Sequence, residues 1–228
     1  MAQLTKESHL TRAPSAADAF ADRQWFIVRR WQEYAGEARA NLLRIVGIGA
    51  FYAVELLNYR GLSLGPIDIP AGVDQQFHTT VTALAVAWLM VALGTLVCLR
   101  IQVFPPILKY VTTAADIALL TTILLVADGP RSSLVAAYFL LIVLSGLRFE
   151  RRLVWCSTLG CMAGYLFVCG FARWVAPERD IAVPRYQQLI VLVALALAGI
   201  ALGQVIRRAR GLAFEFAARI AAGGDQRS

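Results

Sequence analysis

Residues 79–99, "TTVTALAVAWLMVALGTLVCL", decide the fold class of this chain. The stretch contains no charged residue over its 21 positions. At about 1.5 Å per residue, a helix of that length matches the roughly 30 Å hydrocarbon core of a lipid bilayer. The stretch therefore predicts a transmembrane helix.

Further apolar runs of similar kind lie on both sides of it. Hydrophobic residues make up 58% of the 228 residues and charged residues 16%, against about 25% charged residues in ordinary soluble domains. We therefore predict an all-α membrane protein with a six-helix transmembrane domain over 41–210, and the lipid bilayer as its first partner. The six predicted spans are 42–59, 79–99, 107–126, 133–147, 153–174 and 186–206.

Lysine and arginine are distributed unevenly between the two sets of connections. The N-terminal arm, 100–109, 148–152 and the C-terminal tail hold 16 of them, and the opposite loops hold five. Basic residues gather on the cytoplasmic side of membrane proteins, so we predict that both termini are cytoplasmic, in the plasma (inner) membrane of a bacterium. The net charge of +7 belongs to these flanks, so we predict no nucleic-acid partner.

The two ends of the chain have their own patterns. Residues 1–24 carry mixed charges without an apolar segment, which predicts a disordered arm. Residues 25–40 have helical amphipathic spacing, and two interpretations fit them: a helix lying in the headgroup layer, or a cytoplasmic extension of the first span. The short cytoplasmic tail, 211–228, contains one apolar helical stripe, at 211–222, that needs a membrane surface or a partner helix to form.

Asp116 lies near the middle of the third predicted span. A carboxyl group at that depth is costly, so it faces the bundle interior and has partners. We expect a protonated carboxyl bonded to tyrosine hydroxyls. It acts either as an interhelical hydrogen bond that sets helix register or as a site that senses a proton, an ion or a ligand. Its candidate partners at similar depth are Tyr52, Tyr165, Trp88, Thr112 and Thr113.

Glu55 lies about one turn from the outer end of the first span, where it can form an ion pair with Arg60 or Arg131. Arg44, one turn inside the inner end, can extend toward the headgroups. His78 beside the second span is interpreted as a loop residue, with a pH sensor as the alternative.

Two GxxxG motifs occur in the last two spans, Gly160 with Gly164 and Gly199 with Gly203. This spacing lets helix backbones approach closely. Packing of the fifth span against the sixth is one interpretation, and a homodimer face is the other.

Catalytic patterns are missing from the sequence. It contains no Ser/His/Asp set, no HExxH motif, no phosphate-binding glycine loop and no cluster of metal ligands. We therefore predict no enzymatic activity, no cofactor and no metal site.

The stretch 119–149 carries a resemblance. An Asp-Gly-Pro turn is followed by small residues, a Tyr-Phe-Leu run and an inner Leu-Arg-Phe, here Asp128, Gly129, Pro130, Tyr138, Phe139, Leu140, Leu147, Arg148 and Phe149. This resembles the third and fourth helices of six-span N-terminal input modules of bacterial histidine kinases and nucleotide cyclases. Such modules precede an output domain, whereas this chain ends about 20 residues after its last span.

The resemblance implies a sensory or anchoring module that acts through a cytoplasmic signalling partner bound at the tail. A small transporter or channel, and a structural membrane scaffold, are the alternatives.

Overall fold

The computed structural model describes residues 16–64, 67–69, 72, 74–101, 105 and 107–225, with side chains described within 34–61, 72, 74–101, 105 and 107–213. The described chain is helical except for one small hairpin, so the predicted helical class is confirmed. The helices are α1 (Ala16–Arg60), α2 (Gln75–Arg100), α3 (Leu108–Val126), α4 (Ala137–Gly146), α5 (Arg151–Trp174) and α6 (Arg185–Asp225). Short 3-10 helices are η1 (Gly129–Arg131), η2 (Ser133–Ala136) and η3 (Pro177–Arg179). The strands are β1 (Leu62–Leu64) and β2 (Ile67–Ile69), which pair antiparallel with Leu62 opposite Ile69.

Within the described part of the chain, five helices are long and apolar enough to cross a membrane. Large apolar side chains on them face outward, including Met90, Leu159 and Phe167, each about 60% exposed. A soluble protein rarely exposes so much contiguous apolar surface, whereas lipid chains provide a matching environment. The chain is therefore a multi-pass membrane protein. The five segments are Tyr34–Arg60, Gln75–Arg100, Leu108–Val126, Arg151–Trp174 and Arg185–Ala213.

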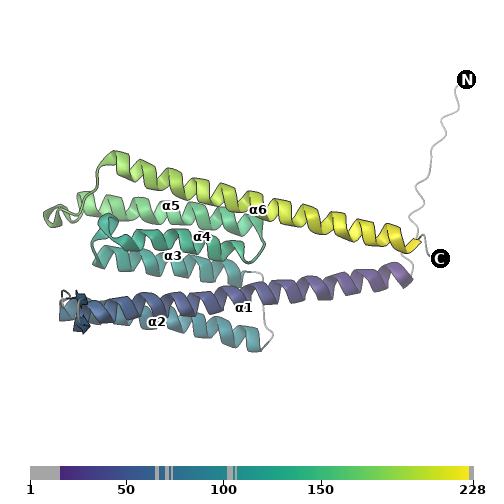
Figure 1. The fold of residues 1–228 in the computed structure, drawn as a ribbon, viewed down its shortest axis with the longest axis horizontal. Coiled ribbons are helices and arrows are strands. Elements are labelled where there is room, and N and C mark those ends of the chain that lie inside the picture. Colours follow the sequence, from purple (N-terminus) through teal and green to yellow (C-terminus); the bar gives the residue numbers. More distant parts are fainter. Residues whose placement is uncertain are drawn as a thin grey trace, which may run out of the picture.

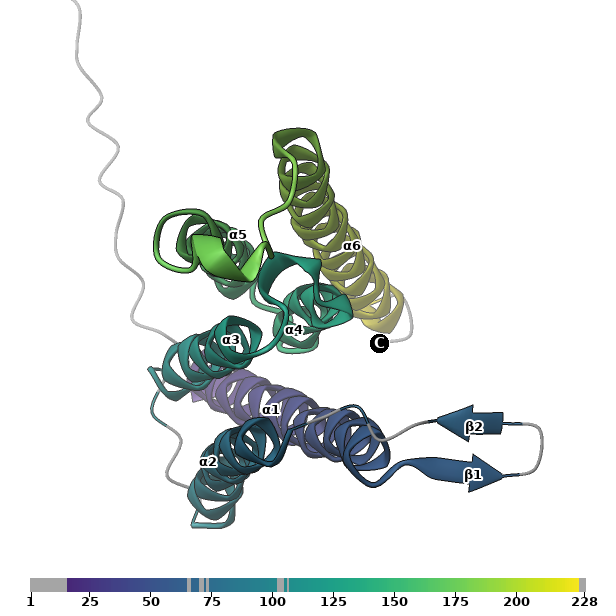
Figure 2. The same ribbon diagram turned by 90° about the vertical axis from the view of Figure 1, so that its left-hand side faces the viewer.

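The fourth predicted span is shorter than the others. Its apolar segment, Ser133–Gly146, starts with η2 and becomes α-helical only at Ala137. The hydroxyl of Ser132 caps this first turn by accepting a hydrogen bond from the Leu134 N–H at 3.2 Å. Seven of the ten α4 residues are buried, and Figure 2 shows α4 between α3, α5 and α6. Neighbouring helices cover most of α4, and only Leu140 and Val143 of α4 are exposed, which explains how so short a helix is accommodated.

The helices form two groups. The antiparallel pair α1 and α2 packs beside the group α3 to α6, as Figure 2 shows end-on. Among the described residues, α2 contacts α3 extensively, while α1 reaches α3 mainly through long polar side chains. The seam between the two groups therefore combines packing of α2 on α3 with specific polar contacts made by α1.

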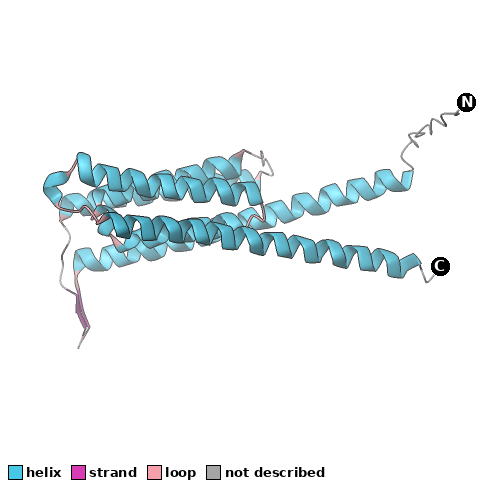
Figure 3. Ribbon diagram, turned by 90° about the horizontal axis from the view of Figure 1, so that it is seen from above, coloured by secondary structure: helices cyan, strands magenta, loops and turns pink. Residues whose placement is uncertain are grey.

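Helices α1 and α6 are much longer than a bilayer requires. The N-terminal part of α1 and the C-terminal part of α6 both project beyond the bundle at the same end (Figures 1 and 3). Helix α1 runs without a break from Ala16 to Arg60, so residues 25–40 belong to the first helix itself. The prediction of disorder is wrong for 16–24, and residues 1–15 lie outside the described residues.

The tail is also part of a long helix. Helix α6 continues to Asp225, so the helix predicted for 211–222 is the direct continuation of the last span. Its apolar stripe lies mostly outside the described side chains, which end at Ala213.

Candidate functional site

Asp116 is the centre of a buried ionic network. Its Oδ2 accepts hydrogen bonds from Arg44 Nε at 3.0 Å and Nη2 at 2.7 Å, and its Oδ1 accepts one from Trp88 Nε1 at 2.7 Å. Asp116 and Arg44 are each 4% exposed. A charge-assisted contact of this kind is among the stronger hydrogen bonds in proteins. The carboxylate thus joins α1, α2 and α3.

The expected partners of Asp116 were therefore wrong in part. Arg44 does not extend toward the headgroups but turns inward, because α1 and α3 run in the same direction and place Arg44 and Asp116 at the same depth. Trp88 is a partner, as expected from its depth. The tyrosines are engaged elsewhere: the Tyr52 hydroxyl lies 3.2 Å from Thr82 Oγ1, and Tyr165 of α5 is buried in the hydrophobic core.

One face of α1 carries the rest of the network. Glu37, Asn41 and Arg44 follow at spacings of four and three residues, which aligns them on one side of a helix. Asn41 Oδ1 accepts a hydrogen bond from Arg44 Nη1 at 2.8 Å, and Asn41 Nδ2 donates to the Ala92 carbonyl at 3.1 Å. Asn41 therefore positions Arg44 and ties it to α2.

Arg148 forms a second buried ion pair, with Glu37 on the same face of α1. Its Nη2 donates to Glu37 Oε1 at 2.6 Å, and Glu37 is only 1% exposed. The same guanidinium donates to Thr112 Oγ1, Thr113 Oγ1 and the Lys109 carbonyl. Thr112 and Thr113, expected beside Asp116, thus hold Arg148 instead. Burial lowers the pKa of Arg148, and the adjacent Glu37 carboxylate opposes that shift.

The two residues after Arg148 bind α6 and add further contacts to α3. Phe149 adopts the left-handed conformation with φ of 51°, and its carbonyl oxygen accepts a hydrogen bond from Arg210 of α6. Glu150 accepts a hydrogen bond from the Tyr110 hydroxyl at 2.9 Å and pairs with Lys109. Burial raises the pKa of Glu150, but the hydrogen bonds from Lys109 and Tyr110 outweigh it and leave the pKa below its ordinary value. The three-residue turn 148–150 therefore contacts α1, α3 and α6 together.

Glu55 has a different partner from the one expected. His78 Nδ1 lies 2.9 Å from Glu55 Oε1, and the imidazole stacks on Tyr59 with ring centroids 3.9 Å apart. Arg131 instead donates to the Ala182 carbonyl at 3.1 Å, and Arg60 is exposed at the end of α1. The predicted pairing of Glu55 with either arginine is therefore wrong. The sequence contained a signal for this contact. Glu55 lies near the end of α1 and His78 lies in the first turn of α2, so an antiparallel pair of these helices brings the two side chains to the same depth.

The glycine motifs pack on several neighbours. A Cβ atom at Gly199 would lie 2.3 Å from Thr158 Oγ1 of α5, whereas one at Gly203 would meet nothing within 4 Å. Gly164 lies against Thr121 of α3 and Tyr138 of α4. Gly160 lies against Ile117 of α3. Packing of α5 on α6 accordingly uses only Gly199, and the homodimer face stays a prediction.

The described residues contain no group of three His, Cys, Asp or Glu side chains arranged to hold a metal ion. Comparison with protein-family models, curated proteins and solved structures gives no match to this chain. Fold and site together define a multi-pass helical membrane protein with a buried ionic network.

Proposed function

We propose that the chain is a non-enzymatic sensory or anchoring module of bacterial signal transduction, which acts through a cytoplasmic partner. In this proposal it crosses the plasma (inner) membrane six times, with both ends in the cytoplasm. The positive-inside distribution of lysine and arginine supports that orientation. The partner binds the projecting part of α6.

One observation carries the proposal: a single turn holds both helices that project from the bundle. Arg148 binds Glu37 of α1, and the carbonyl of Phe149 binds Arg210 of α6. A movement of α3 or α4 that shifts this turn is therefore transmitted to both projecting helices. Coupling between distant sites needs such a contiguous set of contacts with more than one arrangement.

The ionic network favours this function over a transporter. Substrate pathways in transporters are lined by discontinuous helices and polar groups near the bilayer midplane. Here the groups around Asp116 are bonded to one another, and the Arg148 Nε is the only buried polar side-chain atom without a partner among the described residues. A closed network of this kind holds helices in register and can rearrange, but it leaves little free polar surface for a passing ion.

A distance measurement between the projecting helices tests the proposal. Spin labels are placed at Ala21→Cys in α1 and Ala218→Cys in α6, in a Cys98→Ser/Cys156→Ser background that removes the two more accessible thiols. Electron resonance then gives the distance distribution for the full chain in lipid nanodiscs. We expect Arg148→Gln to shift or broaden this distribution, because the turn loses its ion pair with α1.

Arg151→Gln is the matched control. Arg151 lies three residues after Arg148, its side chain is exposed, and its replacement removes the same positive charge. Identical distance distributions for the Arg148→Gln and Arg151→Gln proteins would reject coupling through the turn. Ion flux across liposomes containing the purified protein would instead favour the transporter.

A further inference from the structure

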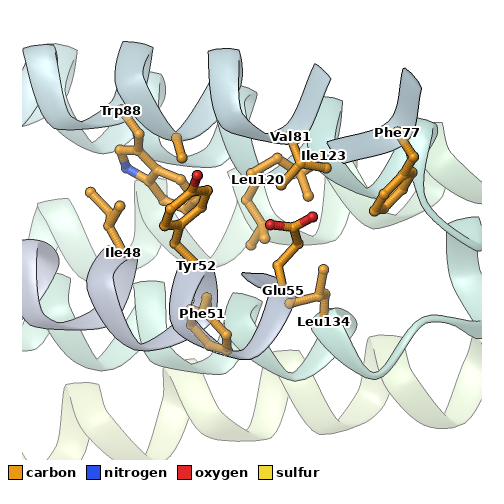
Figure 4. Close-up of a pocket in the computed structure, with 11 residues that line it drawn as sticks. Ile48, Phe51, Tyr52, Glu55, Phe77, Val81, Trp88, Leu120, Ile123 and Leu134 are labelled. Carbon is orange, nitrogen blue, oxygen red and sulfur yellow. The ribbon is translucent and has the colours of Figure 1, made fainter. Parts of the chain in front are cut away.

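A pocket lies between α1, α2 and α3 on the side of Trp88 away from the ionic network. It has a volume of about 80 Å³ and extends toward the end of the bundle where α1 meets the β-hairpin. Figure 4 shows side chains of α1 and α2 facing each other across it. By volume it holds roughly five to eight atoms the size of a water molecule.

Aromatic rings form much of the wall. Phe51 and Tyr52 come from α1, and Phe77 and Trp88 from α2. The indole N–H of Trp88 is bonded to Asp116, so the indole presents only its apolar ring to the pocket. The faces of such rings carry negative partial charge and attract cations within about 6 Å.

Glu55 is the only charged residue among those that line the pocket. Its carboxylate is turned toward the other lining side chains in Figure 4. His78 is held by Glu55 through one ring nitrogen, and a carboxylate has about four acceptor positions. Neither Arg60 nor Arg131 forms an ion pair with Glu55 in the described structure. The pocket therefore combines four aromatic rings with a carboxylate whose two oxygens lie 2.9 and 3.2 Å from one His78 nitrogen and which keeps further acceptor positions.

We propose that this pocket binds a small organic monocation, namely an ammonium ion that carries methyl or other short alkyl groups. The carboxylate matches the charge of such an ion, the aromatic rings match its apolar substituents, and the volume matches a trimethylammonium group. A neutral apolar molecule gains nothing from Glu55, and a hydrated inorganic ion gains little from the rings. Binding of such a cation does not depend on whether the module signals.

Choline and its neutral carbon isostere test the charge requirement without any mutation. In the isostere a tert-butyl group replaces the trimethylammonium group, so size and shape are retained while the charge is lost. Binding is measured by calorimetry on the full chain in phosphatidylglycerol nanodiscs. We expect choline to bind at least about ten-fold more tightly than the isostere. Equal affinities, or no binding of choline, would overturn the proposal.

Two variants locate the site. Glu55→Gln is expected to lower choline affinity about ten-fold or more and leave the isostere unaffected, whereas Glu178→Gln, the same change at an exposed position of η3, leaves both unchanged. Phe77→Leu keeps an apolar wall and removes one ring, so choline affinity falls several-fold. Choline binding that is unaltered in both Glu55→Gln and Phe77→Leu proteins would place the cation elsewhere and reject this pocket.

A trimethylammonium group occurs both in free cations such as choline and in the headgroup of phosphatidylcholine. Replacing part of the phosphatidylglycerol by phosphatidylcholine separates these sources. Competition with free choline in the mixed nanodiscs identifies a lipid headgroup as an occupant, and unchanged affinity identifies a free cation.

Discussion

Asp116 and Arg44 form an ion pair that is almost fully removed from solvent. Such a pair adds little stability compared with apolar residues of the same size, but removing one partner leaves the other charge buried and uncompensated. The pair therefore fixes which arrangement of α1, α2 and α3 is stable. This differs from the neutral carboxyl expected from the sequence, for which a change to asparagine would be tolerated.

Asp116→Asn should destabilise the protein by about 3–5 kcal/mol, because Arg44 then loses its counter-charge. The double variant Arg44→Leu/Asp116→Leu removes both charges and should recover most of that loss. The free energy of unfolding in detergent, measured for Arg44→Leu, Asp116→Leu and the double variant, gives the coupling between the two sites.

The control is Asp128→Asn, the same substitution at an exposed position whose side chain caps no helix. If Asp116→Asn and Asp128→Asn proteins unfold alike, the ion pair does not contribute to stability.

At the scale of helices, close approach depends on individual glycines rather than on the GxxxG pattern. Gly199 lies directly against Thr158, while the space beside Gly203 is open. Gly164 faces α3 and α4 rather than α6. In the motif of α6, Gly199 therefore serves packing within the chain, whereas the surface beside Gly203 is uncovered.

Gly199→Ala should cost about 1–3 kcal/mol of unfolding free energy, because the added methyl group overlaps the Thr158 side chain. Gly203→Ala meets no neighbour within 4 Å, so it should be neutral or stabilise α6 by up to about 1 kcal/mol. Chemical unfolding of the two variants in the same detergent compares them. Equal effects would show that the α5–α6 contact is looser than the structure indicates.

At the scale of the whole molecule, the two projecting helices leave the bundle at one end. That end also contains Arg148 of the α4–α5 connection, and Arg151 and Arg152 in the first turn of α5. If this end is cytoplasmic, the projecting parts of both α1 and α6 are open to the proposed partner, and the pocket beside Glu55 lies toward the opposite face of the membrane.

Reporter fusions check this orientation. A reporter at the N-terminus and one after Arg210 should both report the cytoplasm, because basic residues divide 16 to five between the two sides. Truncated fusions after Arg131 and after Arg152 bracket the short segment Ser133–Gly146 and should report opposite sides. A non-cytoplasmic signal from either terminal fusion would contradict the proposed topology, and matching signals from the bracketing pair would show that the short segment does not cross.

The sequence by itself determined that the chain is a helical membrane protein and where its long helices lie. Residues 79–99 fall within α2, and the predicted third span at 107–126 differs from α3 by one residue at its start. These features depend on the length and polarity of a continuous run, which are local properties. The position of Asp116 inside the third span followed from the same local information.

Only the tertiary structure decided which side chains meet. Arg44 and Asp116 are 72 residues apart in the chain, and Glu37 and Arg148 are 111 apart. Their pairing depends on the direction of each helix, the depth of each residue and the side to which its side chain points, and none of these is visible in a hydropathy run. The same reason explains why Glu55 pairs with His78 rather than with an arginine, and why α4 can be short where other helices enclose it.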